Sequence, residues 1–100
     1  MLPWSLPEVL PVPTPYNVLL RNKTAQKGWQ EICARDAQGA NEAWQFLTTN
    51  PETRIPGKVK RLKGKLAGLL QYDVNYSDRL QYWVDKETNT VWVEYAGPHP

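Results

Sequence analysis

The segment 70–85, LQYDVNYSDRLQYWVD, decides the fold, because two alternating patterns flank a polar turn. Apolar and polar residues alternate on both sides of Ser77-Asp78, and a period of two is typical of strands with one buried face. We therefore predict a β-hairpin here. The inward set is Leu70, Tyr72, Val74, Tyr76, Leu80, Tyr82 and Val84, and the outward set includes Asp73, Arg79 and Trp83.

The flanking sequence adds further elements to this hairpin. Downstream, Val91, Val93 and Tyr95 alternate with polar or outward residues and predict another antiparallel strand. Upstream, residues 16–21 read as a strand, and apolar spacing predicts helices over about 24–36 and 40–49, with Thr24 as a cap and Gly39 as a stop. The predicted fold class is α+β, with two N-terminal helices packed on a small antiparallel sheet of about four strands.

The length of 100 residues predicts one domain, with a proline-rich extension at its start. Residues 1–15 contain five prolines, which prevent a helix or a central strand. This extension is interpreted either as a frayed end or as a segment lying across a groove. We assign 1–15 to the extension and 16–100 to the domain.

Composition predicts a cytoplasmic protein that does not enter a membrane. The sequence has no apolar run of membrane-spanning length and no signal-peptide pattern at its start. Its lone cysteine, Cys33, excludes an internal disulfide and lies on the apolar side of a predicted helix. A packed thiol in a reducing compartment is the expectation.

Positive charge is concentrated in one stretch. Residues 54–65 hold six basic residues and no acid, which leaves six basic residues against ten acidic ones elsewhere. Such a local stripe indicates binding to a polyanion, and the alternative is a solvated lysine-rich loop. The predicted RNA-binding residues are Arg54, Lys58, Arg61, Lys63 and Lys65, with Lys60 in the same stretch.

Two motifs in this order resemble a known family. LKGKLAG at 62–68 is followed by a strand and then by DRLQYWVD at 78–85. Residues 16–100 thereby resemble the RelE/ParE superfamily of toxins from type II toxin–antitoxin systems, and YoeB-like members above all. The resemblance implies one of two activities, since RelE-like members cleave mRNA on the ribosome and ParE-like members inhibit DNA gyrase.

The resemblance also implies a catalytic site. Arg79 matches the strand arginine that contacts the scissile phosphate, and the alternative is a surface arginine paired with Asp73. Lys60 stands where YoeB-like toxins have a glutamate base; phosphate binding is its simpler role, since a lysine acts as a base only where neighbouring cations favour its neutral form. Gln71 and Asp73 stand where RelE has two lysines, so Asp73 is a candidate base or an exposed carboxylate.

His99 matches the terminal catalytic histidine of YoeB-like toxins, although Pro100 follows it in place of a tyrosine. An imidazole exchanges protons near neutral pH, so His99 is the predicted general acid, and the alternative is a chain end without a role. One histidine and one cysteine far apart predict no metal site, and no cofactor is expected.

The outward tryptophans and the overall function complete the predictions. Trp83 and Trp92 predict either base stacking or an apolar patch covered by an antitoxin or by the proline-rich start. We predict a toxin that is a ribosome-dependent, metal-free mRNA endoribonuclease. Its expected partners are a cognate antitoxin, in a possible hetero-oligomer, and mRNA on the ribosome. The alternatives are a ParE-like gyrase inhibitor and an inactive member that binds only its antitoxin.

Overall fold

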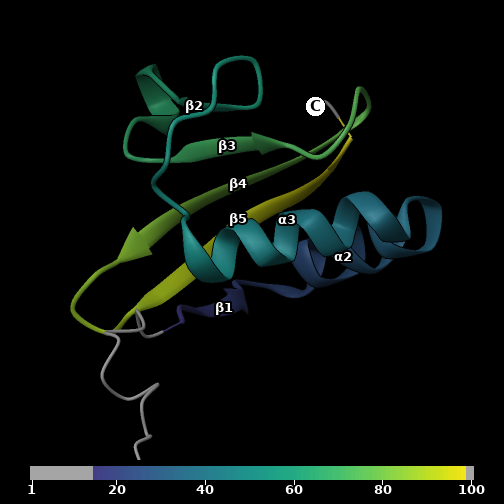
Figure 1. Cartoon of the computed structure of the whole chain (residues 1–100), viewed down its shortest axis with the longest axis horizontal. Coiled ribbons are helices and arrows are strands. Elements are labelled where there is room, and N and C mark those ends of the chain that lie inside the picture. Colours follow the sequence, from purple (N-terminus) through teal and green to yellow (C-terminus); the bar gives the residue numbers. More distant parts are fainter. Residues whose placement is uncertain (1–14, 99–100) are drawn as a thin grey trace, which may run out of the picture.

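The computed structural model describes residues 15–98, in which two helices lie on one face of a five-stranded sheet (Figure 1). Of the predicted extension, only Pro15 falls in this range, and His99 lies outside it. The elements in chain order are β1 (Asn17–Leu20), α2 (Lys23–Arg35), α3 (Ala37–Thr49), β2 (Val59–Arg61), the 3-10 turn η1 (Gly64–Leu66), β3 (Leu70–Asp73), β4 (Asp78–Asp85) and β5 (Thr90–Pro98).

The sheet has the order β1-β5-β4-β3-β2. The predicted hairpin and the following strand form its antiparallel centre, which confirms the α+β class. Two details differ from the prediction. The sheet is mixed because β1 pairs parallel with β5, and it has a fifth strand because β2 pairs with β3 at the edge. The alternation of residues within a strand does not show which distant strand it pairs with, so the parallel β1–β5 pair was not predicted. β2 has only three residues, two of them basic, and therefore lacks the alternating pattern of a strand.

Two polar caps set the boundaries of the helices. The side chain of Asn22, rather than the predicted Thr24, accepts a hydrogen bond from the N–H of Ala25 and begins α2. Asp36 alone separates the helices, because its N–H bonds the Ile32 carbonyl and its carboxylate accepts from the Gly39 N–H. Gly39 is therefore in the first turn of α3, and its predicted role as a helix stop is wrong.

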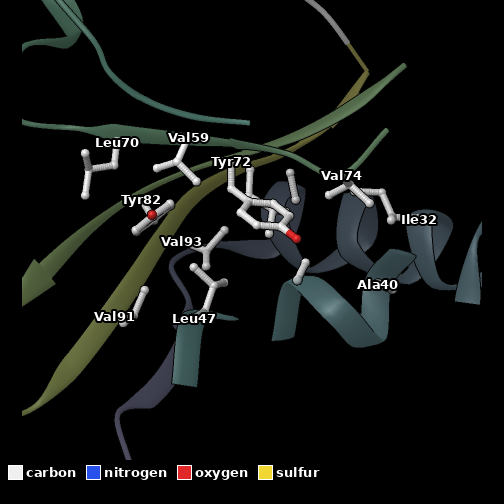
Figure 2. Packing of buried hydrophobic residues seen from close by; sticks show 13 residues of the cluster. Ile32, Ala40, Leu47, Val59, Leu70, Tyr72, Val74, Tyr82, Val91 and Val93 are labelled. Atoms are coloured by element: carbon white, nitrogen blue, oxygen red, sulfur yellow. The ribbon is translucent and has the colours of Figure 1, made fainter. Parts of the chain in front are cut away.

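The core lies between the helices and the inward face of the sheet. Ile32, Ala40, Ala43 and Leu47 are at most 3% exposed and pack on side chains from β3, β4 and β5 (Figure 2). The predicted inward residues Leu70, Tyr72, Val74, Leu80, Tyr82, Val91 and Val93 belong to this core. The prediction was wrong for Tyr76, which is fully exposed because β3 ends at Asp73 and Tyr76 lies in the turn that follows. Burial of these apolar side chains is the main favourable contribution to folding.

A register shift in β5 changes which residues face the helices. Tyr82 pairs with Val93, whereas Gln81 pairs with Tyr95, so Glu94 is an extra residue in β5. The alternation reverses beyond it, and Ala96, not the predicted Tyr95, enters the core. Here α2 packs directly on the sheet backbone. The approach is so close that a side-chain carbon on Gly28 would lie 1.8 Å from the Ala96 carbonyl oxygen. Among residues 15–98, no helix is long and apolar enough to cross a membrane.

Candidate functional site

The helix-free face of the sheet carries a row of polar side chains. Gln81 donates to the amide oxygen of Gln71 at 3.2 Å, and Gln71 donates to Asp73 Oδ1 at 3.0 Å. Both glutamines are buried, so their hydrogen bonds hold the Asp73 carboxylate in a fixed orientation. Lys60 on β2 pairs in register with Gln71, which extends the row to the sheet edge.

Arg79 lies beside this row without a partner. It pairs in register with Asp73, as the sequence predicts, and is half-buried. Nevertheless, among the described residues no ion pair joins Arg79 to Asp73, and the buried Nε of Arg79 has no hydrogen-bond partner. An unpaired buried donor costs about 1–3 kcal/mol, so this Nε does not stabilise the fold through a hydrogen bond to any described residue.

Arg79 and Asp73 line the same hollow. This cavity of about 460 Å³ is bounded by Gly57, Lys58, Asp73, Asn75, Tyr76 and Arg79. A second hollow of about 170 Å³ shares Asp73 and adds Lys60. The Lys58 ammonium lies 5.1 Å from the ring centre of Tyr72. The surface from Lys60 to Arg79 thus combines one carboxylate with several cations, which suits a substrate that carries phosphate.

The β3–β4 turn is fixed to the junction of the two helices. Asn75 accepts hydrogen bonds from the N–H groups of Ser77 and Asp78, both at 2.8 Å. Its amide group donates to Asp36 at 2.9 Å and to Asp78 at 3.3 Å. Arg35 and the buried Asp78 form an ion pair at 2.6 Å.

The pKa values of Asp36 and Arg35 respond to this network. The hydrogen bond from Asn75, that from Gly39 and the charge of Lys58 hold the pKa of Asp36 below its ordinary value. The hydrogen bond to Asp78 raises the pKa of Arg35. Both groups are therefore charged near neutral pH, which keeps the turn in place.

The basic stretch forms the edge of the sheet beside the hollow. All six basic residues of 54–65 are exposed except Lys58, which is half-buried, and none pairs with a described acid. Gly64 and Gly68 adopt positive φ angles of 68° and 99°, which explains the two glycines of the LKGKLAG motif. Lysines on an edge strand also discourage edge-to-edge association, so their charge serves more than one purpose.

Two tryptophans form a second patch on the helix-free face. The rings of Trp83 and Trp92 stack with centroids 6.4 Å apart, and the guanidinium of Arg21 lies 5.2 Å from the Trp92 ring centre. The indole N–H of Trp83 donates to Glu94 at 2.8 Å. Both tryptophans are half-buried, so this patch is partly packed before any partner binds.

The structure separates the predicted site residues into groups. Arg79, Asp73, Lys58 and Lys60 border the two adjoining hollows, whereas Arg54, Arg61, Lys63 and Lys65 do not. Sequence reasoning missed Asn75 and Tyr76 as site residues, because the alternating pattern assigned both to the strand that in the structure ends at Asp73. Within residues 15–98 no group of three or more His, Cys, Asp or Glu side chains is placed to hold a metal ion.

Known structures share this fold. No protein-family model and no curated protein match the sequence. The toxin–antitoxin complex YoeB-YefM from Staphylococcus aureus is similar at 22% identity over 85% of this chain and 98% of that chain, with a TM-score of 0.67. The YoeB/ParE toxin from Agrobacterium tumefaciens gives 18% over 84% and 99%, with a TM-score of 0.69. RelBE2 from Mycobacterium tuberculosis, also a toxin–antitoxin complex, gives 22% over 85% and 99%, with a TM-score of 0.58. The chain therefore has the fold of the YoeB- and RelE-like toxins.

Proposed function

We propose that the protein is the toxin of a type II toxin–antitoxin pair and that it cleaves mRNA on the ribosome without a metal. The observation that carries this proposal is Arg79, which lines a hollow with Asp73 and whose buried Nε has no hydrogen-bond partner among the described residues, on a fold that solved toxins share. A guanidinium that forms no ion pair with a described carboxylate is available for bidentate hydrogen bonds to a phosphate.

Arg79 would act on the charge that develops during cleavage. When a ribose 2′-oxygen attacks the adjacent phosphorus, negative charge grows on the phosphate oxygens. Hydrogen-bond donors that already point at the phosphate oxygens do not have to move during the reaction. Removal of one such donor lowers the rate about a hundredfold or more. Lys60, at the wall of the adjoining hollow, adds positive charge for the same phosphate.

Asp73 is the proposed general base. The chain of hydrogen bonds from Gln81 through Gln71 reaches only its Oδ1. Oδ2 is therefore left to accept the proton from the 2′-hydroxyl as the new 2′-oxygen–phosphorus bond forms. The bond from phosphorus to the 5′-oxygen then breaks and leaves a cyclic phosphate. Neighbouring Arg79 and Lys60 offset the repulsion between this carboxylate and RNA.

His99 is the proposed general acid, which protonates the departing 5′-oxygen. It lies outside the described residues, so the assignment rests on its match to the terminal histidine of YoeB-like toxins and on the chain before it. Pro98 pairs in register with Asp78, and Gly97 pairs with Arg79. The last described residues of β5 therefore lie in register beside Asp78 and Arg79.

The proposed partner is an acidic antitoxin in the cytoplasm, where mRNA and ribosomes are found. The unpaired basic residues of 54–65 offer a complementary surface to an acidic segment, and the Trp83–Trp92 patch on β4 and β5 offers apolar area. Such a segment would cover the hollow and block RNA. YoeB-YefM and RelBE2 are complexes of this kind.

A gyrase inhibitor is the second candidate. One similar structure carries both the YoeB and ParE names, and Lys60 stands where YoeB-like toxins have their base. A binder of this class needs neither an acid nor a base. DNA supercoiling by purified gyrase in the presence of this protein separates this candidate from an endoribonuclease.

The test is single-turnover cleavage of mRNA on purified ribosomes. We expect the wild type to cleave and both Arg79→Ala and His99→Gln to cleave about a hundredfold or more slowly. Arg21→Ala is the matched control, because Arg21 lies on the same face but pairs with Glu94 away from the hollow. A wild type that leaves mRNA intact and inhibits gyrase would replace the proposal with the second candidate.

A further inference from the structure

The turn before Arg79 presents an aromatic side chain entirely to solvent. Tyr76 is 105% exposed, whereas the other exposed large apolar side chains among the described residues lie between 37% and 44%. A ring without any packing contributes nothing to the core. The turn that carries Tyr76 is nevertheless fixed, because Asn75 and Asp78 on either side of it bond to each other and to the helix junction.

Tyr76 stands between two hollows of different charge. On one side is the 460 Å³ hollow with Arg79, Lys58 and a single acid. On the other is a hollow of about 410 Å³ that contains the acids Asp36 and Asp78 together with Arg35. A phosphate is attracted to the first and repelled from the second. A nucleotide would therefore approach the face of the ring that borders Arg79.

We propose that Tyr76 is a stacking platform for a base of the bound RNA, next to the phosphate held by Arg79. This inference rests on the proposed function and adds a subsite to it. The hollow of about 460 Å³ is in the size range of sites that hold small ligands, about 300–1,000 Å³. Base stacking on aromatic side chains is the usual way in which proteins bind unpaired RNA.

The fixed turn makes this platform effective. Binding to a mobile loop would carry the entropic cost of ordering it, whereas the Asn75 network has ordered the turn before RNA arrives. The stacked base would orient the adjoining ribose, and hence its 2′-hydroxyl, toward Asp73. Tyr76 thus acts as a positioning residue and does not exchange a proton, so its ring is needed and its hydroxyl is not.

The experiment is a cycle of protein and RNA changes in the single-turnover ribosome assay. Wild type, Tyr76→Ala and Tyr76→Phe are compared on mRNA in which each nucleotide around the cleavage site is in turn made abasic. We expect Tyr76→Ala to lower cleavage efficiency about 5- to 140-fold, the scale for loss of one stacked base. Tyr76→Phe should retain full efficiency.

The abasic substrates identify the contact. At one nucleotide, removal of the base should impair the wild type and add little to Tyr76→Ala. Leu19→Ala is the control for loss of exposed apolar surface, since Leu19 is 44% exposed on the far edge strand β1. If Tyr76→Ala cleaves as wild type does, or loses the same factor on every abasic substrate, the stacking role is wrong while the endonuclease stands. If wild type cleaves nothing, the proposed function and this subsite fail together.

Discussion

The two faces of the β3–β4 hairpin are built from alternate residues of the same strands, and they follow opposite rules. On the helix-covered face, Leu80 and Tyr82 are fully buried among apolar side chains. On the helix-free face, Arg79 and Gln81 are also largely enclosed, yet the buried Nε of Arg79 has no hydrogen-bond partner among residues 15–98. Adjacent residues thus differ in whether the protein itself supplies all the contacts of their side chains.

This difference separates stability from function. A covered-face side chain has all its contacts within the protein, so its loss is expected to appear as unfolding. A helix-free-face side chain such as Arg79 has unused binding capacity, so its loss is expected to appear in activity. Substitutions at neighbouring positions provide the most direct test, because strand and depth stay nearly constant while the face changes.

The largest expected effect is on the covered face. Leu80→Ala removes a fully buried side chain from the centre of the core and leaves a cavity. The free energy of unfolding should fall by about 2–5 kcal/mol, a large share of the 5–15 kcal/mol typical of a domain. Urea unfolding followed by tryptophan fluorescence measures it. The exposed Lys86→Ala is the control, and a loss below about 1 kcal/mol for Leu80→Ala would contradict the assigned core.

A smaller effect is expected where the covered face contains a polar atom. The Tyr82 hydroxyl donates to the Pro51 carbonyl at 2.6 Å. Tyr82→Phe leaves that carbonyl without its donor and should cost about 1–2 kcal/mol. Burial, and then the charge of Glu52, raise the pKa of Tyr82 well above the tyrosine value of about 10.

Because the pKa of Tyr82 is raised in the fold, the contribution of this residue to the free energy of unfolding depends on pH. Above about pH 10 the unfolded chain loses this proton and the folded chain keeps it, so wild-type stability should fall as pH rises. The stabilisation is complete below pH 10 and disappears as pH passes the folded pKa. Tyr82→Phe should reduce this alkaline loss, whereas the exposed Tyr76→Phe should leave it unchanged. Equal alkaline slopes for all three proteins would show that Tyr82 is not protected in the fold.

Sequence reasoning succeeded where the signal was local. Strict alternation identified both strands of the hairpin and placed Arg79 on the helix-free face. It failed where pairing joined distant segments: the parallel β1–β5 pair and the edge strand β2 leave no periodic trace. The extra residue Glu94 reversed the later alternation, so Tyr95 and Ala96 exchanged faces.

The candidate site shows the same division. The resemblance to RelE- and YoeB-like toxins pointed to Arg79, Asp73 and Lys60, and the structure shows that these residues border adjoining hollows. The expected alternative, an ion pair between Arg79 and Asp73, is absent between these two described residues, and Gln71 donates a hydrogen bond to Asp73. Which side chains bond to each other depends on distances in space, and so does the position of Tyr76 between two hollows.

The smallest expected effect on stability is at Arg79 itself, and it would sharpen the comparison most. Arg79→Met keeps an unbranched stem of similar reach but removes the buried Nε that has no hydrogen-bond partner. The free energy of unfolding should therefore stay within about 0.5 kcal/mol of wild type or rise, although the adjacent Leu80→Ala costs several times more. Inorganic phosphate should stabilise the wild type, by about 2.7 kcal/mol at a hundred times its Kd, and not the variant. A loss above about 1 kcal/mol without phosphate would make Arg79 a structural residue. In that case the distinction between the two faces would not hold at the residue that carries the proposed function.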